Sequence, residues 1–235
     1  MPRLFLSKES RCAARSREVV AWAAFVIPLA GIACSGHGRP IALTDTTKLK
    51  AAPSAAPAAN APTRVGVTGG FSSPESAVFD SSEGYWYVSN IAGGATDKDH
   101  NGFISRLRAD GELDSLHYIK SGVNGALLDG PKGLALHGDT IWAADIDMAR
   151  AFDKHTAKPL ATVDFRPFHA LLLNAIAIGP DGRVYITDTG IRLVGGQPKH
   201  VAPDHIFVIG PGLTPGIATT DSSMEGADGI AWDGA

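Results

Sequence analysis

The segment 173–190, LNAIAIGPDGRVYITDTG, decides the fold. A short apolar run precedes the turn sequence Pro-Asp-Gly, and a run rich in β-branched and aromatic residues follows it, which predicts two antiparallel strands. Two earlier segments have the same pattern, and the last residues repeat its first run alone. These segments are PESAVFDSSEGYWYVSN (74–90), PKGLALHGDTIWAADI (131–146) and GADGIAWDGA (226–235). The chain therefore contains an internal repeat.

A more variable half follows each strand pair. It reads GFISRL and DSLHYI in the first unit, ARAFD and PLATVDF in the second, and DHIFVI and GIATT in the third. Each unit thus offers four short strands, with a period of about forty to sixty residues, as in the blades of a β-propeller. A β-sandwich is the main competing fold, but its strands need not share a common opening pattern.

The sequence predicts an all-β, six-bladed β-propeller, of which three blades and the first strand of a fourth are present. Three blades cannot close a ring, and open strand edges are normally covered, so we expect the chain to be incomplete at its C-terminus. The segment TRVGVT (63–68) alternates like a strand. It is either the outer strand of a final blade or a simple lead-in.

The N-terminal part divides into two further regions. Residues 1–34 are typical of an export signal, because basic residues precede an apolar run of about fifteen residues, shorter than the roughly twenty of a spanning helix. Residues 35–62 are rich in Ala and Pro, which predicts a disordered linker. Residues 63–235 form the partial propeller domain.

Cys34 follows Gly31, Ile32 and Ala33, a sequence similar to the lipidation site of bacterial lipoproteins, although Gly31 stands where leucine is usual. Two alternatives stay open. Either Cys34 is lipidated and anchors the protein in a membrane, or the signal is cleaved for plain secretion. Both predict an exported bacterial protein, periplasmic or membrane-anchored, and membrane contact is expected only if Cys34 carries the lipid anchor.

Composition excludes several functions. The net charge of −3 provides no basic field for nucleic acid. Both cysteines, Cys12 and Cys34, precede the predicted domain, so that domain has no disulfide or thiolate nucleophile. No G-x-S-x-G elbow, P-loop or dinucleotide-binding fingerprint is present, which disfavours serine-nucleophile and nucleotide-dependent chemistry.

One repeat position is the best candidate for chemistry. The first strand of each propeller blade lies innermost, so residues that open these strands face one another around the channel. They are Glu75, Lys132, Asn174 and Asp228. Three of the four carry oxygen ligands of the kind that Ca²⁺ prefers. The alternative is a set of polar side chains that hydrogen-bond to one another in the channel.

These residues resemble a known pattern. From about Phe71 to its end, the chain is similar to the senescence marker protein/gluconolactonase/luciferin-regenerating-enzyme family of six-bladed propellers. In that family a Glu opening the first blade, an Asn opening the third and an Asp opening the fourth hold one divalent metal. Glu75, Asn174 and Asp228 match these positions in order, so the resemblance implies a divalent cation, Ca²⁺ being favoured.

The resemblance implies hydrolysis of a lactone or similar ester. Asp228 would both ligate the metal and accept a proton from water, as its counterpart is thought to do in the family. Lys132 departs from the family, whose lactonases carry a substrate-contacting Asn there, and this disfavours a sugar lactone. Lys132 either binds a carboxylate or phosphate of the substrate or forms an ion pair across the channel. The alternative function is a non-catalytic propeller that binds a protein or glycan at the cell envelope, while a strictosidine-synthase-like enzyme is less favoured.

Other polar residues are better explained by structure. Asp97, Asp99 and Asn101 alternate as in an EF-hand loop, but Arg108 stands where the loop requires Glu, which favours a polar turn. Polar residues end the second strand of each unit, which predicts hydrogen bonds between blades. These are Asn90, Asp145 and Asp188. The histidines are scattered without metal-ligand spacing, so we expect none of them to be catalytic.

Overall fold

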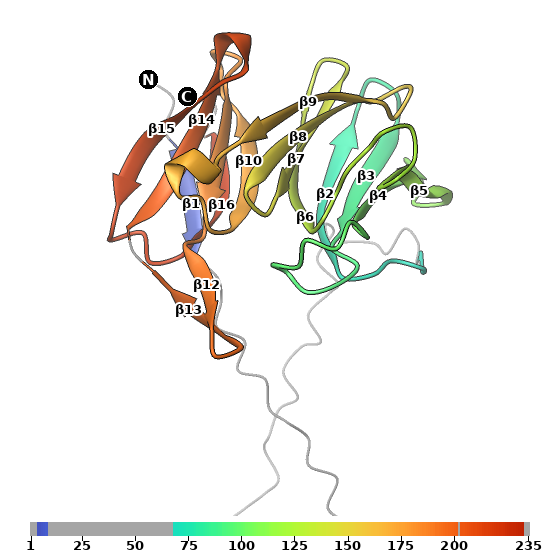
Figure 1. Cartoon of the computed structure of the whole chain (residues 1–235). Helices are drawn as coiled ribbons and strands as arrows, with labels where there is room; N and C mark the ends of the chain where they lie inside the picture. The colour runs from blue at the N-terminus through green and yellow to red at the C-terminus, as the bar shows by residue number, and fades with distance from the viewer. Residues whose placement is uncertain (1–3, 9–67, 202, 233–235) are drawn as a thin grey trace, which may run out of the picture. The chain divides into compact units, whose positions relative to one another are not determined.

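The computed structural model describes residues 4–8, 68–201 and 203–232, which belong to one compact unit, and for 4–8 only the backbone is considered. The architecture is all-β, with three four-stranded antiparallel sheets, none of them closed (Figure 1). The predicted export segment beyond residue 8, Cys34 and the Ala/Pro-rich linker lie outside the described residues. Among the described residues, no helix has the length and apolar character that a bilayer crossing requires.

Each sheet is built from consecutive segments of the chain, as the repeat predicts. The first sheet contains β2 (Pro74–Asp80), β3 (Tyr85–Asn90), β4 (Phe103–Arg108) and β5 (Leu113–Lys120). The second contains β6 (Pro131–His137), β7 (Thr140–Asp145), β8 (Met148–Asp153) and β9 (Pro159–Asp164). The third contains β10 (Leu173–Ile178), β11 (Val184–Asp188), β14 (Asp204–Gly210) and β15 (Thr214–Asp221). The prediction of three four-stranded units is confirmed.

Shorter elements complete the described part. The predicted insertion in the third unit folds as a hairpin of β12 (Ile191–Val194) and β13 (Gln197–His200), placed between β11 and β14. Within the described ranges there are two short 3₁₀ helices, η1 (Arg166–Phe168) and η2 (Pro211–Leu213). β16 (Ala227–Trp232) pairs with β1 (Leu4–Lys8), which comes from the predicted export segment.

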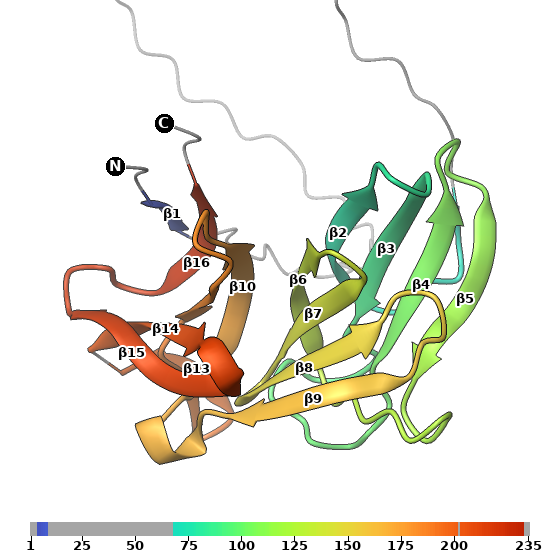
Figure 2. The ribbon, with the colours of Figure 1, turned by 90° about the horizontal axis from the view of Figure 1, so that it is seen from above.

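The first strands of the sheets lie side by side. β2 is next to β6, β6 is next to β10, and β10 is next to β16, while the later strands of each sheet lie progressively farther out (Figure 2). This arrangement is propeller-like. Gly133 permits the close approach of β6 to β10, because a Cβ there would lie 2.5 Å from the carbonyl oxygen of Asn174 in β10.

Strand alternation sends apolar side chains from each sheet toward the next. The cluster between the first and second sheets is centred on Tyr87, Ile104, Ile141 and Phe152. The cluster between the second and third sheets is centred on Trp142, Phe165, Ile186 and Phe207. Each fully buried side chain of this size contributes about 1.5–3 kcal/mol, so packing between sheets holds the unit together.

The core assignment predicts a large effect at Phe207, which is fully buried and lies 4.9 Å from Phe165 between ring centroids. Phe207→Ala removes this packing and leaves a cavity, so we expect a loss of about 3–5 kcal/mol of unfolding free energy in urea titrations. Leu160→Ala, at a side chain that is 56% exposed, serves as the control and should change it by no more than about 0.5 kcal/mol. Equal effects of the two substitutions would contradict the assignment.

Candidate functional site

The four residues predicted to face the channel occupy equivalent β-bulges. In β2, β6 and β10 the pairing register shifts after the first residue, so that two residues oppose one on the next strand. The same shift occurs where β16 pairs with β1. The first residue of each bulge is Glu75, Lys132, Asn174 or Asp228. Bulges re-aim side chains and are frequent beside active sites.

At two of these bulges a backbone N–H group loses its partner on the next strand, and a hydroxyl side chain accepts its hydrogen bond instead. Ser89 Oγ accepts a hydrogen bond from the N–H of Ser76 at 2.9 Å, and Thr187 Oγ1 accepts one from the N–H of Ala175 at 3.0 Å. Thr187 Oγ1 also donates to the carbonyl oxygen of Asp228 at 2.6 Å. Thr187 thus joins β10 to β16 beside the predicted ligands Asn174 and Asp228.

The three predicted metal ligands differ in exposure. Glu75 is exposed, Asn174 is 5% exposed, and Asp228 is half-buried, which raises its pKa above the ordinary value. The amide nitrogen of Asn174 donates to Thr189 Oγ1 at 2.9 Å. This contact fixes the amide so that its oxygen, which accepts no hydrogen bond from the described residues, is the atom offered to a ligand.

The donor chemistry of these residues suits a hard divalent cation, because all three offer oxygen atoms at the same end of the sheets. Asn174 and Asp228 come from the adjacent strands β10 and β16, whereas Glu75 comes from β2, which is separated from β10 by β6. Among residues 68–201 and 203–232, no group of three or more His, Cys, Asp or Glu side chains is placed to hold a metal ion. The predicted set has only two such side chains, Glu75 and Asp228, and its third predicted ligand is the amide of Asn174.

Lys132 is held by backbone carbonyl groups. The side chain is 3% exposed, and its ammonium group donates to the carbonyl oxygens of Ala95 at 2.9 Å and Gly130 at 3.0 Å. Burial lowers the pKa of Lys132 to about 8, while the carboxylates of Asp145 and Glu75 partly oppose this shift. Two of the three donors of the ammonium group are therefore already used.

The polar residues that end β3, β7 and β11 were predicted to form hydrogen bonds between blades. They instead bind the segment that leads into the first strand of their own sheet. Each side-chain oxygen accepts backbone N–H groups just before the first strand. Asn90 accepts from Ser72, Asp145 from Asp129 and Gly130, and Asp188 from Leu171 and Leu172. In the second and third sheets this segment is the connection from the preceding sheet, so the side chains fix where each new sheet begins.

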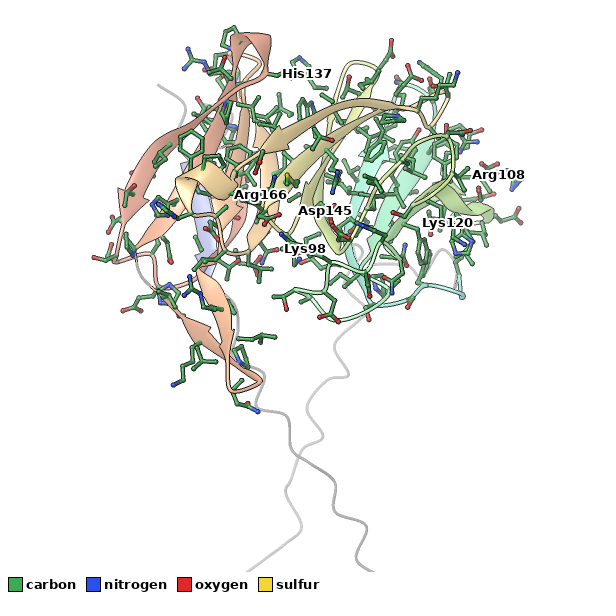
Figure 3. The ribbon with its side chains drawn as sticks, in the orientation of Figure 1. Lys98, Arg108, Lys120, His137, Asp145 and Arg166 are labelled. Atoms are coloured by element: carbon green, nitrogen blue, oxygen red, sulfur yellow. The ribbon has the colours of Figure 1, made fainter. Side chains whose placement is uncertain are left out.

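Asp145 also anchors a buried ion pair. Its carboxylate accepts a hydrogen bond from Arg150 Nε at 2.7 Å, and Arg150 lies 3.6 Å from Asp129. Burial raises the pKa of Asp145, and the Arg150 guanidinium opposes that shift. Figure 3 shows Asp145 and Lys98 at the end of the sheets where the inner strands begin, and His137 at the other end.

No sequence pattern indicates the partner that the structure shows for His100. His100 Nδ1 lies 2.6 Å from the buried carboxylate of Asp129, whose same oxygen accepts the backbone N–H of His100 at 3.0 Å. The two residues are far apart in sequence, in loops whose spacing carries no signal. In the same loop, Asp97 and Asp99 accept hydrogen bonds from Gly94 and Asn101, as expected of a polar turn.

An open pocket of about 360 Å³ lies at this end of the sheets. Its walls come from the loop between β3 and β4, the β7–β8 turn, the segment before β10, and β12. The carbonyl oxygen of Ile146, in the pocket wall, accepts the N–H of Leu173 at 2.6 Å. The pocket therefore adjoins the start of β10, where Asn174 lies.

Comparison of the chain with protein-family models and with curated protein sequences finds no match.

The burial of Lys132 predicts a distinct titration. We expect its side-chain signals in lysine-selective NMR to titrate near pH 8, well below those of exposed lysines. Because the unfolded chain binds this proton more tightly, Lys132 should make the unfolding free energy rise with pH between about 8 and 10.5. Titration of Lys132 together with the exposed lysines would contradict the described burial.

The role of Asp145 predicts a strong dependence of stability on its carboxylate. Asp145→Ala leaves Arg150 and two backbone N–H groups without their acceptor, which should reduce the unfolding free energy by about 3–5 kcal/mol. Asp164→Ala is the matched control, because Asp164 also binds an arginine, Arg166, but both side chains are solvent-accessible. Denaturant titrations in which the two substitutions cost the same would argue against the anchoring role.

Proposed function

We propose that the three sheets are blades of a six-bladed β-propeller, that β16 is the first strand of a fourth blade, and that the protein is an exported, divalent-cation-dependent hydrolase of lactones or similar esters. The observation that carries this proposal is the shared bulge position of Glu75, Asn174 and Asp228 on the inner strands β2, β10 and β16. These residues also match, in order, the metal ligands of the senescence marker protein/gluconolactonase/luciferin-regenerating-enzyme family.

Glu75, Asn174 and Asp228 would hold the cation, which we expect to be Ca²⁺. When bound, the cation supplies polarisation of the substrate carbonyl and stabilisation of the developing negative charge. Asp228 accepts a proton from the attacking water at its carboxylate. Thr189 keeps the amide oxygen of Asn174 turned outward, and Thr187 holds the backbone of Asp228.

Lys132 contributes to substrate binding in this proposal through its remaining donor. An ammonium group attracts a carboxylate or phosphate but accepts no hydrogen bond from a sugar hydroxyl. A substrate with an acidic group therefore suits the site better than a neutral sugar lactone. Lipidation of Cys34 remains part of the proposal as the means of membrane attachment.

One observation favours a second candidate, a non-catalytic propeller that binds a protein or glycan. Lys132 occupies the same bulge position as the predicted ligands, and its positive charge opposes the binding of a second cation nearby. In this candidate Glu75 and Lys132 form an ion pair, and the channel end of the sheets serves as a binding surface.

Calcium titration of the full-length chain separates the two candidates. For the hydrolase we expect one Ca²⁺ per chain by calorimetry, with binding reduced at least about tenfold by Asn174→Ala, because one ligand is lost. Asn101→Ala, in the exposed polar turn, is the matched control and should leave Ca²⁺ binding unchanged. Hydrolysis of a lactone panel should stop when a chelator is added and resume with Ca²⁺.

Two results would overturn the hydrolase. One is the absence of Ca²⁺ binding by the folded chain. The other is Ca²⁺ binding that neither Asn174→Ala nor Asp228→Ala weakens. Binding without hydrolysis of any lactone or ester in the panel would leave the metal site in place and would favour the non-catalytic candidate.

A further inference from the structure

We propose that the pocket between the β3–β4 loop and the β12–β13 hairpin binds a small organic carboxylate with an apolar body, and that Arg192 binds the carboxylate. This inference rests on the proposed function in so far as the ligand is the substrate or its product. The pocket volume of about 360 Å³ is in the lower part of the range of small-molecule sites.

Apolar side chains form most of the pocket wall. They are Ile146, Ala170, Leu171, Ile191 and Leu193, contributed by three separate segments of the chain. Leu193 is 50% exposed, although it belongs to the wall of a concave site. Covering this surface with the apolar part of a ligand is favourable at about 25 cal/mol per Å², so the pocket suits a hydrocarbon or aromatic body.

The charges of the pocket leave one cation available. The ammonium group of Lys98 is paired with the carboxylate of Asp147, so these two pocket residues neutralise each other. The Arg192 side chain forms no ion pair or hydrogen bond with any residue in the described ranges. A guanidinium group presents two parallel N–H donors that match the two oxygens of a carboxylate. We therefore expect the ligand to carry a carboxylate that binds Arg192.

The register of the hairpin supports an anionic ligand independently. Arg192 lies directly opposite Lys199 in the β12–β13 pairing, and like charges at such positions destabilise a hairpin. Lys199 also has no anionic partner within residues 68–201 and 203–232. An anion bound at Arg192 relieves this repulsion, whereas a neutral ligand does not.

The backbone of the pocket wall is strained at Ile146. This β-branched residue has a φ of 59°, a region that normally favours glycine, and its side chain is only 4% exposed. Strain of this kind is concentrated at ligand-binding and catalytic sites, where the surrounding structure maintains it. Ile146 therefore keeps an apolar side chain in the pocket wall at a position where glycine fits the backbone more easily.

Binding of phenylbutyrate and of its neutral amide, phenylbutyramide, tests the proposal. Calorimetry or ligand-observed NMR on the full-length chain, with a chelator present, should show the carboxylate binding at least about tenfold more tightly than the amide. Arg192→Gln should reduce phenylbutyrate binding to the level of the amide. Lys199→Gln removes the neighbouring charge that the anion also neutralises, so it should weaken phenylbutyrate binding, but clearly less than Arg192→Gln, because Lys199 lies outside the pocket.

Several outcomes would overturn the proposal. They are equal binding of acid and amide, unchanged binding by Arg192→Gln, and equal losses from Arg192→Gln and Lys199→Gln, which would indicate general electrostatic attraction. Circular dichroism should confirm that both variants of this exposed hairpin fold. The chelator removes the cation, so phenylbutyrate binding is measured independently of the metal site. Phenylbutyrate binding by a chain that fails to bind Ca²⁺ would contradict the hydrolase and support the pocket. Ca²⁺ binding by a chain that fails to bind phenylbutyrate would contradict the pocket and leave the hydrolase in place.

Discussion

The candidate site depends on a β-bulge that is repeated near the start of each inner strand. At this bulge two residues of the inner strand lie opposite one residue of the next strand. A regular strand would place the side chains at these positions within the alternating faces that pack between sheets. The bulge turns the first residue out of that alternation. Hydroxyl groups of Ser89 and Thr187 satisfy the backbone N–H groups it frees, so the distortion leaves no buried donor unpaired in these two sheets.

Charge at this end of the sheets is mostly neutralised by local partners. Arg150 is paired with Asp145, Lys98 with Asp147, and the ammonium group of Lys132 with backbone carbonyls. These pairings fix the loops that surround the pocket. The Arg192 side chain is the exception among these cations, and it lies on a hairpin inserted between β11 and β14 of the third sheet.

Most of the fold could be predicted because the strand signal is local. Alternating apolar residues and turn sequences such as Pro-Asp-Gly specify short strands, and their repetition specifies three similar sheets. The site was predicted less completely. Its bulge positions follow from the repeat, but the partners of Lys132 and His100 come from loops with no periodic pattern. His100 lies 29 residues before Asp129, and no spacing rule relates them.

By itself, the sequence determined the all-β class, the three four-stranded units and the shared position of Glu75, Lys132, Asn174 and Asp228, because propensity and pattern act over a few residues. Only the tertiary structure decided which polar groups are buried and what they contact. It gave Lys132 two carbonyl acceptors, gave His100 a carboxylate, and left the Arg192 side chain, beside an apolar pocket, without an ion-pair partner among the described residues. Burial and electrostatic pairing depend on distances between segments far apart in the chain, and a linear pattern does not contain those distances.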